Sequence, residues 1–298
     1  MKTLVMYCTH IIDDNIKFFL RHGYFSDEHT DFYICLNGDF DIDHYNKFIK
    51  DKNINNLFFI KRENTKLDFG AWSHTLFLKK DNKKLYENYD YFIFINSSCI
   101  GPFLPIYVKE KWTTLFINML SNTVKLVGPT INHCHGRPHV QSYFLCTDKI
   151  GLDIALNNGI FDLMLLDEYN KNDESIYTKE IINEIIKEII IDFHEIGFSK
   201  HILDSGYEIK SLLKGIENAN ISENLNNETL NFSYGHIGYD ICGHNKYFGI
   251  CFHPYEVIFY KSNRHIGDNT LIRYISFHNE IKNEYTDTFN DLFNQTIL

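Results

Sequence analysis

The sequence predicts an α/β protein with a mixed, mainly parallel central sheet. Apolar runs typical of buried strands alternate with amphipathic helical patterns along the first part of the chain. Several of these runs end abruptly in small polar or charged residues. The clearest spans residues 89–103, which begins aromatic and β-branched, turns polar at Asn96-Ser97-Ser98 and breaks at Gly101-Pro102. Ligands of open α/β sheets bind beyond the carboxyl ends of the strands, so this pattern predicts a pocket there.

The first part of the chain follows a β-α-β-α-β order, the signature of a parallel sheet. Helical spacing of apolar side chains separates short apolar runs, and Gly23 is a natural helix stop. We expect strands over residues 3–8, 31–36 and 56–60, and helices over 11–22 and 43–51.

The following segments extend this sheet. A helix begins near Asp68 and frays in the lysine-rich residues 79–84. After the strand that ends at Asn96, we expect a helix over 111–121 and a fifth strand over 123–127, stopped by Gly128-Pro129.

The second part of the chain is more helical. The longest helical pattern covers residues 178–194, and Gly197 is expected to end it. Residues 215–234 are polar and rich in asparagine. We also expect an extended segment over 139–146, helices over 148–157 and 199–205, a strand or helix over 207–212, a strand over 257–260 and a helical tail. No repeat or clear linker interrupts residues 1–298, which predicts one domain with halves of about 1–130 and about 131–298.

Composition narrows the classes of function. The 298 residues carry a formal net charge of −10, which argues against a general nucleic-acid partner. No apolar segment reaches the roughly 18 residues that a membrane span needs, so we expect no transmembrane segment. The N-terminal residues resemble a strand rather than a signal peptide. The seven cysteines are an odd number within apolar runs, which favours reduced thiols and a cytoplasmic protein.

Polar strand ends predict a nucleotide site. In a parallel sheet these ends converge on one edge, where carboxylate and amide groups suit a base and ribose and cations suit phosphate. Gly70 permits close approach of the backbone to a ligand. Neither a G-x-G-x-x-G nor a G-x-x-x-x-G-K-[ST] motif is present, so a dinucleotide-binding dehydrogenase or P-loop enzyme is not favoured. The candidate residues are Thr9, His10, Asn37, Arg62, Asn64, Asp68, Gly70, Asn96, Ser97 and Ser98.

Two cations near the C-terminus are candidates for holding phosphate. Lys261 and Arg264 flank Ser262 and Asn263 after a predicted strand. Such a pair can grip a diphosphate leaving group and offset the charge that develops as its bond breaks. The alternative is a solvated basic turn.

Residues 133–139 form a loop rich in metal-ligand atoms. Cys134 with His133, His135 and His139 supplies the atoms that zinc prefers. Three of these four residues are adjacent in the chain and cannot all easily point inward, so we favour a polar loop that faces substrate.

Glu195 is a candidate general base. It lies where the long helix is expected to end, and the negative end of a helix dipole favours the protonated form of a carboxyl group. The alternative is an exposed surface glutamate.

The order and spacing of five segments resemble the glycosyltransferases related to the rhamnan-synthesis F family. The resemblance runs from the first strand to about Leu213 and extends into the C-terminal part. Its segments are Asn64-x3-Asp68-Phe69-Gly70-Ala71-Trp72, Asn96-Ser97-Ser98-x2-Gly101-Pro102-Phe103, Val127-Gly128-Pro129-Thr130-Ile131, His139-Val140-Gln141-Ser142-Tyr143-Phe144, and residues 255–264.

The resemblance implies a GT-A fold, with a nucleotide-sugar-binding half at about 1–130 and an acceptor-binding half at about 131–298. It implies transfer of a sugar, such as the deoxyhexose rhamnose, from a nucleoside-diphosphate sugar to a glycan, glycoprotein or other hydroxyl acceptor. His139, Gln141 and Ser142 become candidates for binding the acceptor or sugar. Asn263 joins Lys261 and Arg264 in the donor site.

Many GT-A enzymes hold Mn or Mg with an Asp-x-Asp sequence where this chain has Asn96-Ser97-Ser98. A hard divalent ion prefers anionic oxygen ligands, so we assign no metal residues and leave metal dependence open. We favour an inverting mechanism with Glu195 as the base and Asp148 as a weaker candidate. Two alternatives remain: a metal-dependent hydrolase or nucleotidyl enzyme that uses the histidine-rich loop, and a non-catalytic nucleotide- or glycan-binding module.

Overall fold

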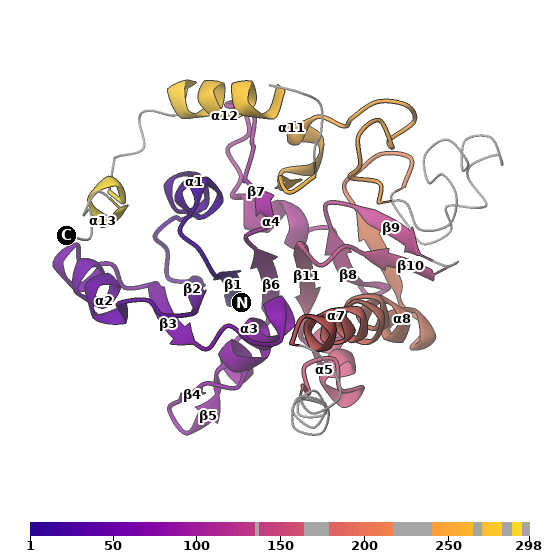
Figure 1. Cartoon of the computed structure of the whole chain (residues 1–298), viewed down its shortest axis with the longest axis horizontal. Coiled ribbons are helices and arrows are strands. Elements are labelled where there is room, and N and C mark those ends of the chain that lie inside the picture. The colour runs from indigo at the N-terminus through magenta and orange to yellow at the C-terminus, as the bar shows by residue number, and fades with distance from the viewer. Residues whose placement is uncertain (135–136, 164–178, 217–239, 265–269, 282–287, 294–298) are drawn as a thin grey trace.

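A mixed seven-stranded sheet forms the centre of the protein. The computed structural model describes residues 1–134, 137–163, 179–216, 240–264, 270–281 and 288–293 (Figure 1). The strands of the sheet are β1 (Thr3–Thr9), β2 (Thr30–Asn37), β3 (Leu57–Arg62), β6 (Tyr91–Asn96), β8 (Val124–Gly128), β11 (Phe144–Asp148) and β12 (Glu208–Ser211). Their order is β12-β8-β11-β6-β1-β2-β3.

One strand of this sheet runs against the others. β11 is antiparallel to both of its neighbours, β6 and β8, whereas the remaining pairs are parallel. The carboxyl ends of the six parallel strands therefore share one edge, and the beginning of β11 lies at that same edge. This architecture confirms the predicted α/β class with a mixed, mainly parallel sheet.

Helices cover both faces of the sheet (Figure 1). α1 (Asp14–His22) and α4 (Trp112–Ile117) pack on one face, and α3 (Leu67–Leu76), α5 (Lys149–Asn157) and α8 (Gly197–Asp204) pack on the other. The described helices also include α2 (Ile42–Asp51), the short η1 (Leu85–Asn88), α7 (Lys179–Ile189), α11 (Pro254–Val257), α12 (Thr270–Ile281) and α13 (Asn290–Phe293). In this described part, none of the helices combines the length and apolar composition that a membrane crossing requires.

The apolar strands form the core because both faces of the sheet are covered. All seven residues of β1 are buried. On one face the Tyr7 ring stacks on Phe19 of α1 at 4.7 Å, and on the other the Trp72 ring of α3 meets Phe94 of β6 edge-on at 5.5 Å. The alternation of side chains along each strand thus anchors a helix on each side.

Three small antiparallel pairs complete the described strands. β13 (Tyr260–Lys261) pairs with β7 (Cys99–Ile100), and β9 (Ile131–Cys134) pairs with β10 (Arg137–Val140). β4 (Lys79–Lys80) and β5 (Lys83–Lys84) form a hairpin where the sequence predicted a fraying helix. α3 ends at Leu76, and Asp81 and Asn82 adopt the positive φ values that a tight hairpin turn needs.

Three predictions for the second part of the chain are wrong. The predicted strand over 257–260 is absent, because Val257 ends α11 and only Tyr260 and Lys261 form β13. Residues 139–146 do not form one extended segment, because β10 and β11 belong to different sheets and Gln141 to Tyr143 connect them. Gly197 does not end the long helix: α7 continues through a π-helical segment, η2 (Ile190–Ile196), directly into α8. A glycine inside a helix costs only about 1 kcal/mol, and the burial of Ile190, Ile196 and Phe198 along this continuous helix outweighs that cost.

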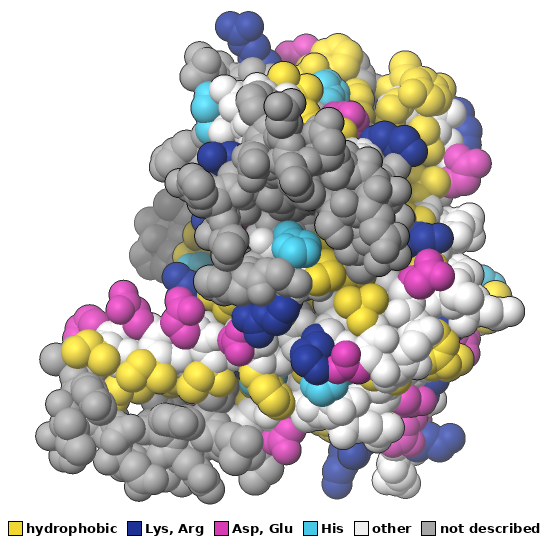
Figure 2. All heavy atoms as spheres, turned by 90° about the vertical axis from the view of Figure 1, so that its right-hand side faces the viewer, with side chains coloured by type: hydrophobic (Ala, Val, Ile, Leu, Met, Phe, Trp, Pro, Cys, Tyr) yellow, Lys and Arg dark blue, Asp and Glu magenta, His cyan; other side chains and the backbone are white. Residues whose placement is uncertain are grey.

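α7 is amphipathic, yet part of its apolar surface is exposed. Ile182 and Ile186 are buried, whereas Ile181 and Ile185 are exposed. Figure 2 shows exposed hydrophobic side chains in a row along this helix, beside acidic ones. The predicted halves share one sheet, since β11 and β12 follow residue 130, and the division near that residue stays a prediction.

Candidate functional site

A pocket of about 370 Å³ lies at the edge where the parallel strands end. It brings together residues that are far apart in the chain, from the ends of β1, β2 and β6, the start of α3 and the segment after β13. Most of the predicted site residues line it. These are Thr9, His10, Asn37, Asn64, Asp68, Asn96, Ser97, Ser98, Ser142, Lys261, Asn263 and Arg264.

Asp68 and Asn96 form a hydrogen-bonded pair in the pocket. The Asn96 amide nitrogen donates to Asp68 Oδ2 at 2.7 Å, and the Phe69 backbone N–H donates to Asp68 Oδ1 at 3.0 Å. Burial raises the pKa of Asp68 to about 6, and the nearby Glu195 carboxylate adds to this rise. Asp68 therefore titrates near neutral pH, which suits a group that handles protons or hydroxyl groups.

The turn after β6 is fixed by its own side chains. Asn96 Oδ1 accepts the Ser98 backbone N–H at 3.0 Å and the Ser98 hydroxyl at 2.5 Å. Because Asn96 donates to Asp68 and accepts from Ser98, its orientation is determined on both sides. The turn and the start of α3 are thus held together across the pocket.

Lys261 and Arg264 reach the pocket because β13 pairs with β7, immediately after the Asn96-Ser97-Ser98 turn. The Ser262 backbone N–H donates to the Ser98 carbonyl at 2.8 Å. The Asn15 amide donates to both the Ser97 carbonyl and the Ser262 hydroxyl at 2.8 Å. This network ties the C-terminal cations to the end of the central strand.

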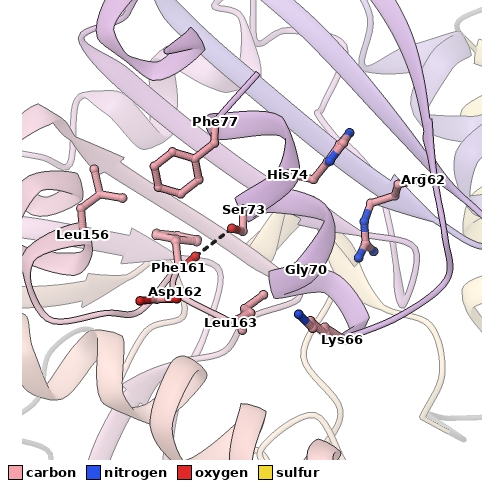
Figure 3. A pocket seen from close by; sticks show the side chains of 10 residues that line it. All are labelled: Arg62, Lys66, Gly70, Ser73, His74, Phe77, Leu156, Phe161, Asp162 and Leu163. Atoms are coloured by element: carbon pink, nitrogen blue, oxygen red, sulfur yellow. Dashed lines mark hydrogen bonds between the residues drawn. The ribbon is translucent and has the colours of Figure 1, made fainter. Parts of the chain in front are cut away.

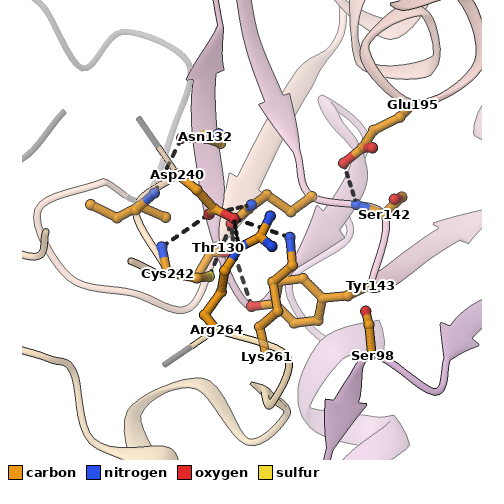
Figure 4. A network of polar contacts seen from close by, with 12 residues as sticks. Ser98, Thr130, Asn132, Ser142, Tyr143, Glu195, Asp240, Cys242, Lys261 and Arg264 are labelled. Atoms are coloured by element: carbon orange, nitrogen blue, oxygen red, sulfur yellow. Dashed lines mark hydrogen bonds and ion pairs between the residues drawn. The ribbon is translucent and has the colours of Figure 1, made fainter. Parts of the chain in front are cut away.

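A partly buried carboxylate, Asp240, holds both cations (Figure 4). Its Oδ2 lies 3.2 Å from Lys261 Nζ and 2.8 Å from Arg264 Nε, while its Oδ1 accepts from Gln141 Nε2 at 2.7 Å. Burial opposes ionisation, but Lys261, Arg264 and Gln141 together hold the pKa of Asp240 well below its usual range. The carboxylate therefore stays ionised, and its charge raises the pKa of the partly buried Lys261 despite desolvation.

The residues predicted to bind the acceptor fall into two groups. Ser142 lines the pocket, and its backbone N–H donates to Glu195 Oε1 at 2.9 Å (Figure 4). Gln141 is buried and fully engaged, because its carbonyl oxygen accepts from the Thr130 hydroxyl at 2.8 Å while its amide holds Asp240. His139 is also buried, and desolvation lowers its pKa although Glu195 and Asp240 oppose that effect.

The two predicted catalytic carboxylates occupy different places. Glu195 lies next to Ser142, but the premise for its choice is wrong, since η2 continues into α8 and Glu195 is not at a helix end. Asp148 lies at the end of β11, and β11 runs against its neighbours, so this end is at the opposite edge of the sheet. Asp148 caps α5 through the Gly151 N–H and pairs with Lys125 at 2.6 Å. We therefore remove Asp148 from the site.

Arg62 and Gly70 line a neighbouring cavity of about 510 Å³ between α3 and the segment after α5 (Figure 3). Arg62 also contacts the pocket at the sheet edge, because its Nη1 donates to Oδ1 of Asn37, which lines that pocket, at 3.2 Å. Gly70 allows a close approach, but to protein rather than to the pocket: a Cβ there would lie 2.7 Å from the Thr65 carbonyl oxygen. Gly70 thus allows α3 to pack closely against the turn after β3.

The histidine-rich loop lies only partly within the described residues. His133 is on β9 and His139 on β10, whereas His135 and the side chain of Cys134 lie outside that part. Throughout the residues that the structure describes, no three His, Cys, Asp or Glu side chains are grouped as metal ligands would be.

Two residues in or next to the pocket had no signal in the sequence. Lys187 lines the pocket from α7, and Asp240 lies directly behind the two cations. Lys187 is one of two lysines on the amphipathic α7, and Asp240 follows a polar, asparagine-rich segment. Only the folded chain distinguishes them from surface residues.

Comparisons with known proteins give weak structural similarity. No protein-family model and no curated protein matches the chain. The mannosyltransferase PcManGT from Pyrobaculum calidifontis, in complex with GDP-Man and Mn²⁺, is 9% identical over 51% of this chain and 46% of its own, with a TM-score of 0.34. The glycosyltransferase GlyE from Streptococcus pneumoniae TIGR4 is 14% identical over 64% and 44%, with a TM-score of 0.35.

S. aureus TarS 1-349 is 14% identical over 55% of this chain and 51% of its own, with a TM-score of 0.33. This chain thus spans about half the length of each of these three solved proteins.

Proposed function

We propose that the protein is a GT-A glycosyltransferase that binds a nucleoside-diphosphate sugar in the pocket at the sheet edge. The observation that supports this most is the arrangement of charge: the Asp68–Asn96 pair and Lys261 with Arg264 line the same pocket. Cations suit the diphosphate, and carboxylate and amide groups suit hydroxyls of a ribose or sugar. The carboxyl edge of a parallel sheet is where such ligands bind.

Lys261 and Arg264 are proposed to neutralise the diphosphate. As the bond between the anomeric carbon and the diphosphate breaks, negative charge develops on the leaving group, and these two cations stabilise it. Asn37, Asn64 and Asp68 hold polar groups of the nucleoside or sugar. Thr9, His10, Ser97, Ser98 and Asn263 complete the lining.

The described pocket residues do not fit a divalent metal well. Among the described residues that line the pocket, Asp68 is the only carboxylate, and its two oxygens already accept from Asn96 and Phe69. Mn²⁺ and Mg²⁺ prefer several anionic oxygen ligands. We therefore assign charge neutralisation to this chain's own cations.

Glu195 is the proposed general base of an inverting reaction. The hydroxyl oxygen of a glycan or glycoprotein acceptor attacks the anomeric carbon, the bond to the diphosphate breaks, and the hydroxyl proton passes to the carboxylate. One Glu195 oxygen is held by the Ser142 N–H, and within the described part of the chain the other has no hydrogen-bond partner. A deoxyhexose such as rhamnose is the proposed sugar.

A measurement of turnover distinguishes a glycosyltransferase from a binding module that has lost catalysis. Purified protein is incubated with a panel of nucleoside-diphosphate sugars, and release of the nucleoside diphosphate is followed with and without candidate glycan acceptors. We expect release with one donor and its loss in Asp68→Ala, which must stay folded. Binding without release would favour the non-catalytic module, to which the missing carboxylates at Asn96-Ser97-Ser98 also point.

A further inference from the structure

Asp240 is the most completely bonded carboxylate near the pocket, although it does not line the pocket itself. Its Oδ2 accepts from Lys261 and Arg264, and its Oδ1 accepts from Gln141 Nε2 and from the Cys242 backbone N–H at 3.0 Å. A carboxylate offers about four acceptor positions, so all of them are used. Asp240 has none left for a ligand.

Lys261 and Arg264, in contrast, have N–H donors that Asp240 does not use. Asp240 takes one N–H of the Lys261 ammonium and the Nε–H of Arg264. Within the described part of the chain, their remaining N–H groups have no other hydrogen-bond partner. The free edge of the Arg264 guanidinium carries the paired donors that match two phosphate oxygens. Figure 4 shows both side chains converging on Asp240.

The support behind Asp240 is buried and polar. Gln141 holds Oδ1, the Thr130 hydroxyl holds the Gln141 carbonyl oxygen, and the Tyr143 hydroxyl lies 2.9 Å from the Thr130 hydroxyl. All three of these supporting residues are buried. The ring of Tyr143 also lies beneath Lys261 Nζ, 5.7 Å away. Such a connected network fixes a side chain far better than an exposed ion pair does.

We propose that Asp240 is a positioning residue, which holds Lys261 and Arg264 so that their remaining donors meet the diphosphate of the bound sugar donor. This inference rests on the proposed function. Asp240 touches neither donor nor acceptor and acts only through the two cations. The phosphates lie beyond the cations, which screen them from the Asp240 charge, so orientation outweighs repulsion.

The test measures binding of a nucleoside diphosphate and of its nucleoside by calorimetry, using the diphosphate that binds the wild-type protein. Asp240→Asn keeps the side-chain shape and removes the charge. The matched control is Asp291→Asn, which breaks an exposed ion pair of similar length, 3.0 Å from Lys52. We expect Asp240→Asn to weaken diphosphate binding about 10- to 100-fold. Nucleoside binding and the control should change by less than about twofold.

A mutant cycle shows whether Asp240 acts through the cations. In a Lys261→Ala/Arg264→Ala protein, Asp240→Asn should cause no further loss of diphosphate affinity. Three results would each overturn the inference. The first is that Asp240→Asn weakens diphosphate binding as much in the double variant as in the wild-type protein. The others are that Asp240→Asn weakens nucleoside and diphosphate binding equally, or that it tightens diphosphate binding. If Asp240→Asn fails to fold, Gln141→Met can replace it, since it removes one hydrogen-bond donor to Asp240. Gln141→Met should weaken diphosphate binding but not nucleoside binding, by a smaller factor than Asp240→Asn. A wild-type protein that binds no nucleoside diphosphate would instead overturn the proposed function.

Discussion

Asp68 should cost the protein stability at neutral pH, because it is ionised where burial disfavours its charge. The difference between a pKa of about 6 and the ordinary 3.8 corresponds to about 3 kcal/mol when the group is ionised in the folded protein. Since the folded protein binds the Asp68 proton more tightly than the unfolded chain, the penalty is full above pH 6. It disappears as the pH falls towards 4.

Asp68→Asn removes this penalty while keeping the shape. We expect the variant to be about 1–2 kcal/mol more stable than wild type at about pH 8, and similar at about pH 4.5. The gain is smaller than the full penalty because the Asn96 amide and the Phe69 N–H must then share one carbonyl oxygen. The same variant should lose transfer activity.

Urea denaturation at both pH values measures the effect, with Asp204→Asn as an exposed control on α8 that should change stability by less than about 0.5 kcal/mol. The reasoning fails if Asp68→Asn is no more stable than wild type at about pH 8. It also fails if the two proteins depend equally on pH.

Three further substitutions test separate parts of the account. Glu195→Gln should reduce turnover by about 10²- to 10⁴-fold while diphosphate affinity in calorimetry stays unchanged, and normal turnover would remove Glu195 as the base. Asp148→Asn should destabilise the protein by about 3 kcal/mol, because it leaves the buried Lys125 ammonium unpaired, yet the donor KM should not move; a selective rise in KM would return Asp148 to the site. Gly70→Ala should lower stability by about 1–3 kcal/mol in denaturation, since the added Cβ would lie 2.7 Å from the Thr65 carbonyl oxygen, and an unchanged midpoint would contradict that packing.

The sequence allowed the central sheet and most of the pocket to be predicted, because both depend on local patterns. Apolar runs that end in polar residues mark the ends of β1, β2 and β6, and parallel strands bring such ends to one edge. Thr9, Asn37 and Asn96 were found in this way.

The wrong predictions concern features that depend on the direction of a strand or on tertiary contacts. Because β11 runs antiparallel to its neighbours, Asp148 lies at the edge of the sheet opposite the pocket. No local sequence pattern indicates the direction of a strand. Gly197 resembles a helix stop, but packing keeps the helix continuous past Glu195. Asp240 gains its role only because β13 pairs with β7 and places Lys261 against it.

Binding of a nucleoside diphosphate through Lys261 and Arg264 is the central claim, and calorimetry tests it most directly. Wild type and Lys261→Ala/Arg264→Ala are titrated with UDP, GDP, TDP and CMP, each with and without Mn²⁺. We predict that one nucleoside diphosphate binds wild type without Mn²⁺ and binds the variant at least about tenfold more weakly. Binding that needs Mn²⁺, binding that the variant retains in full, or no binding at all would contradict the claim.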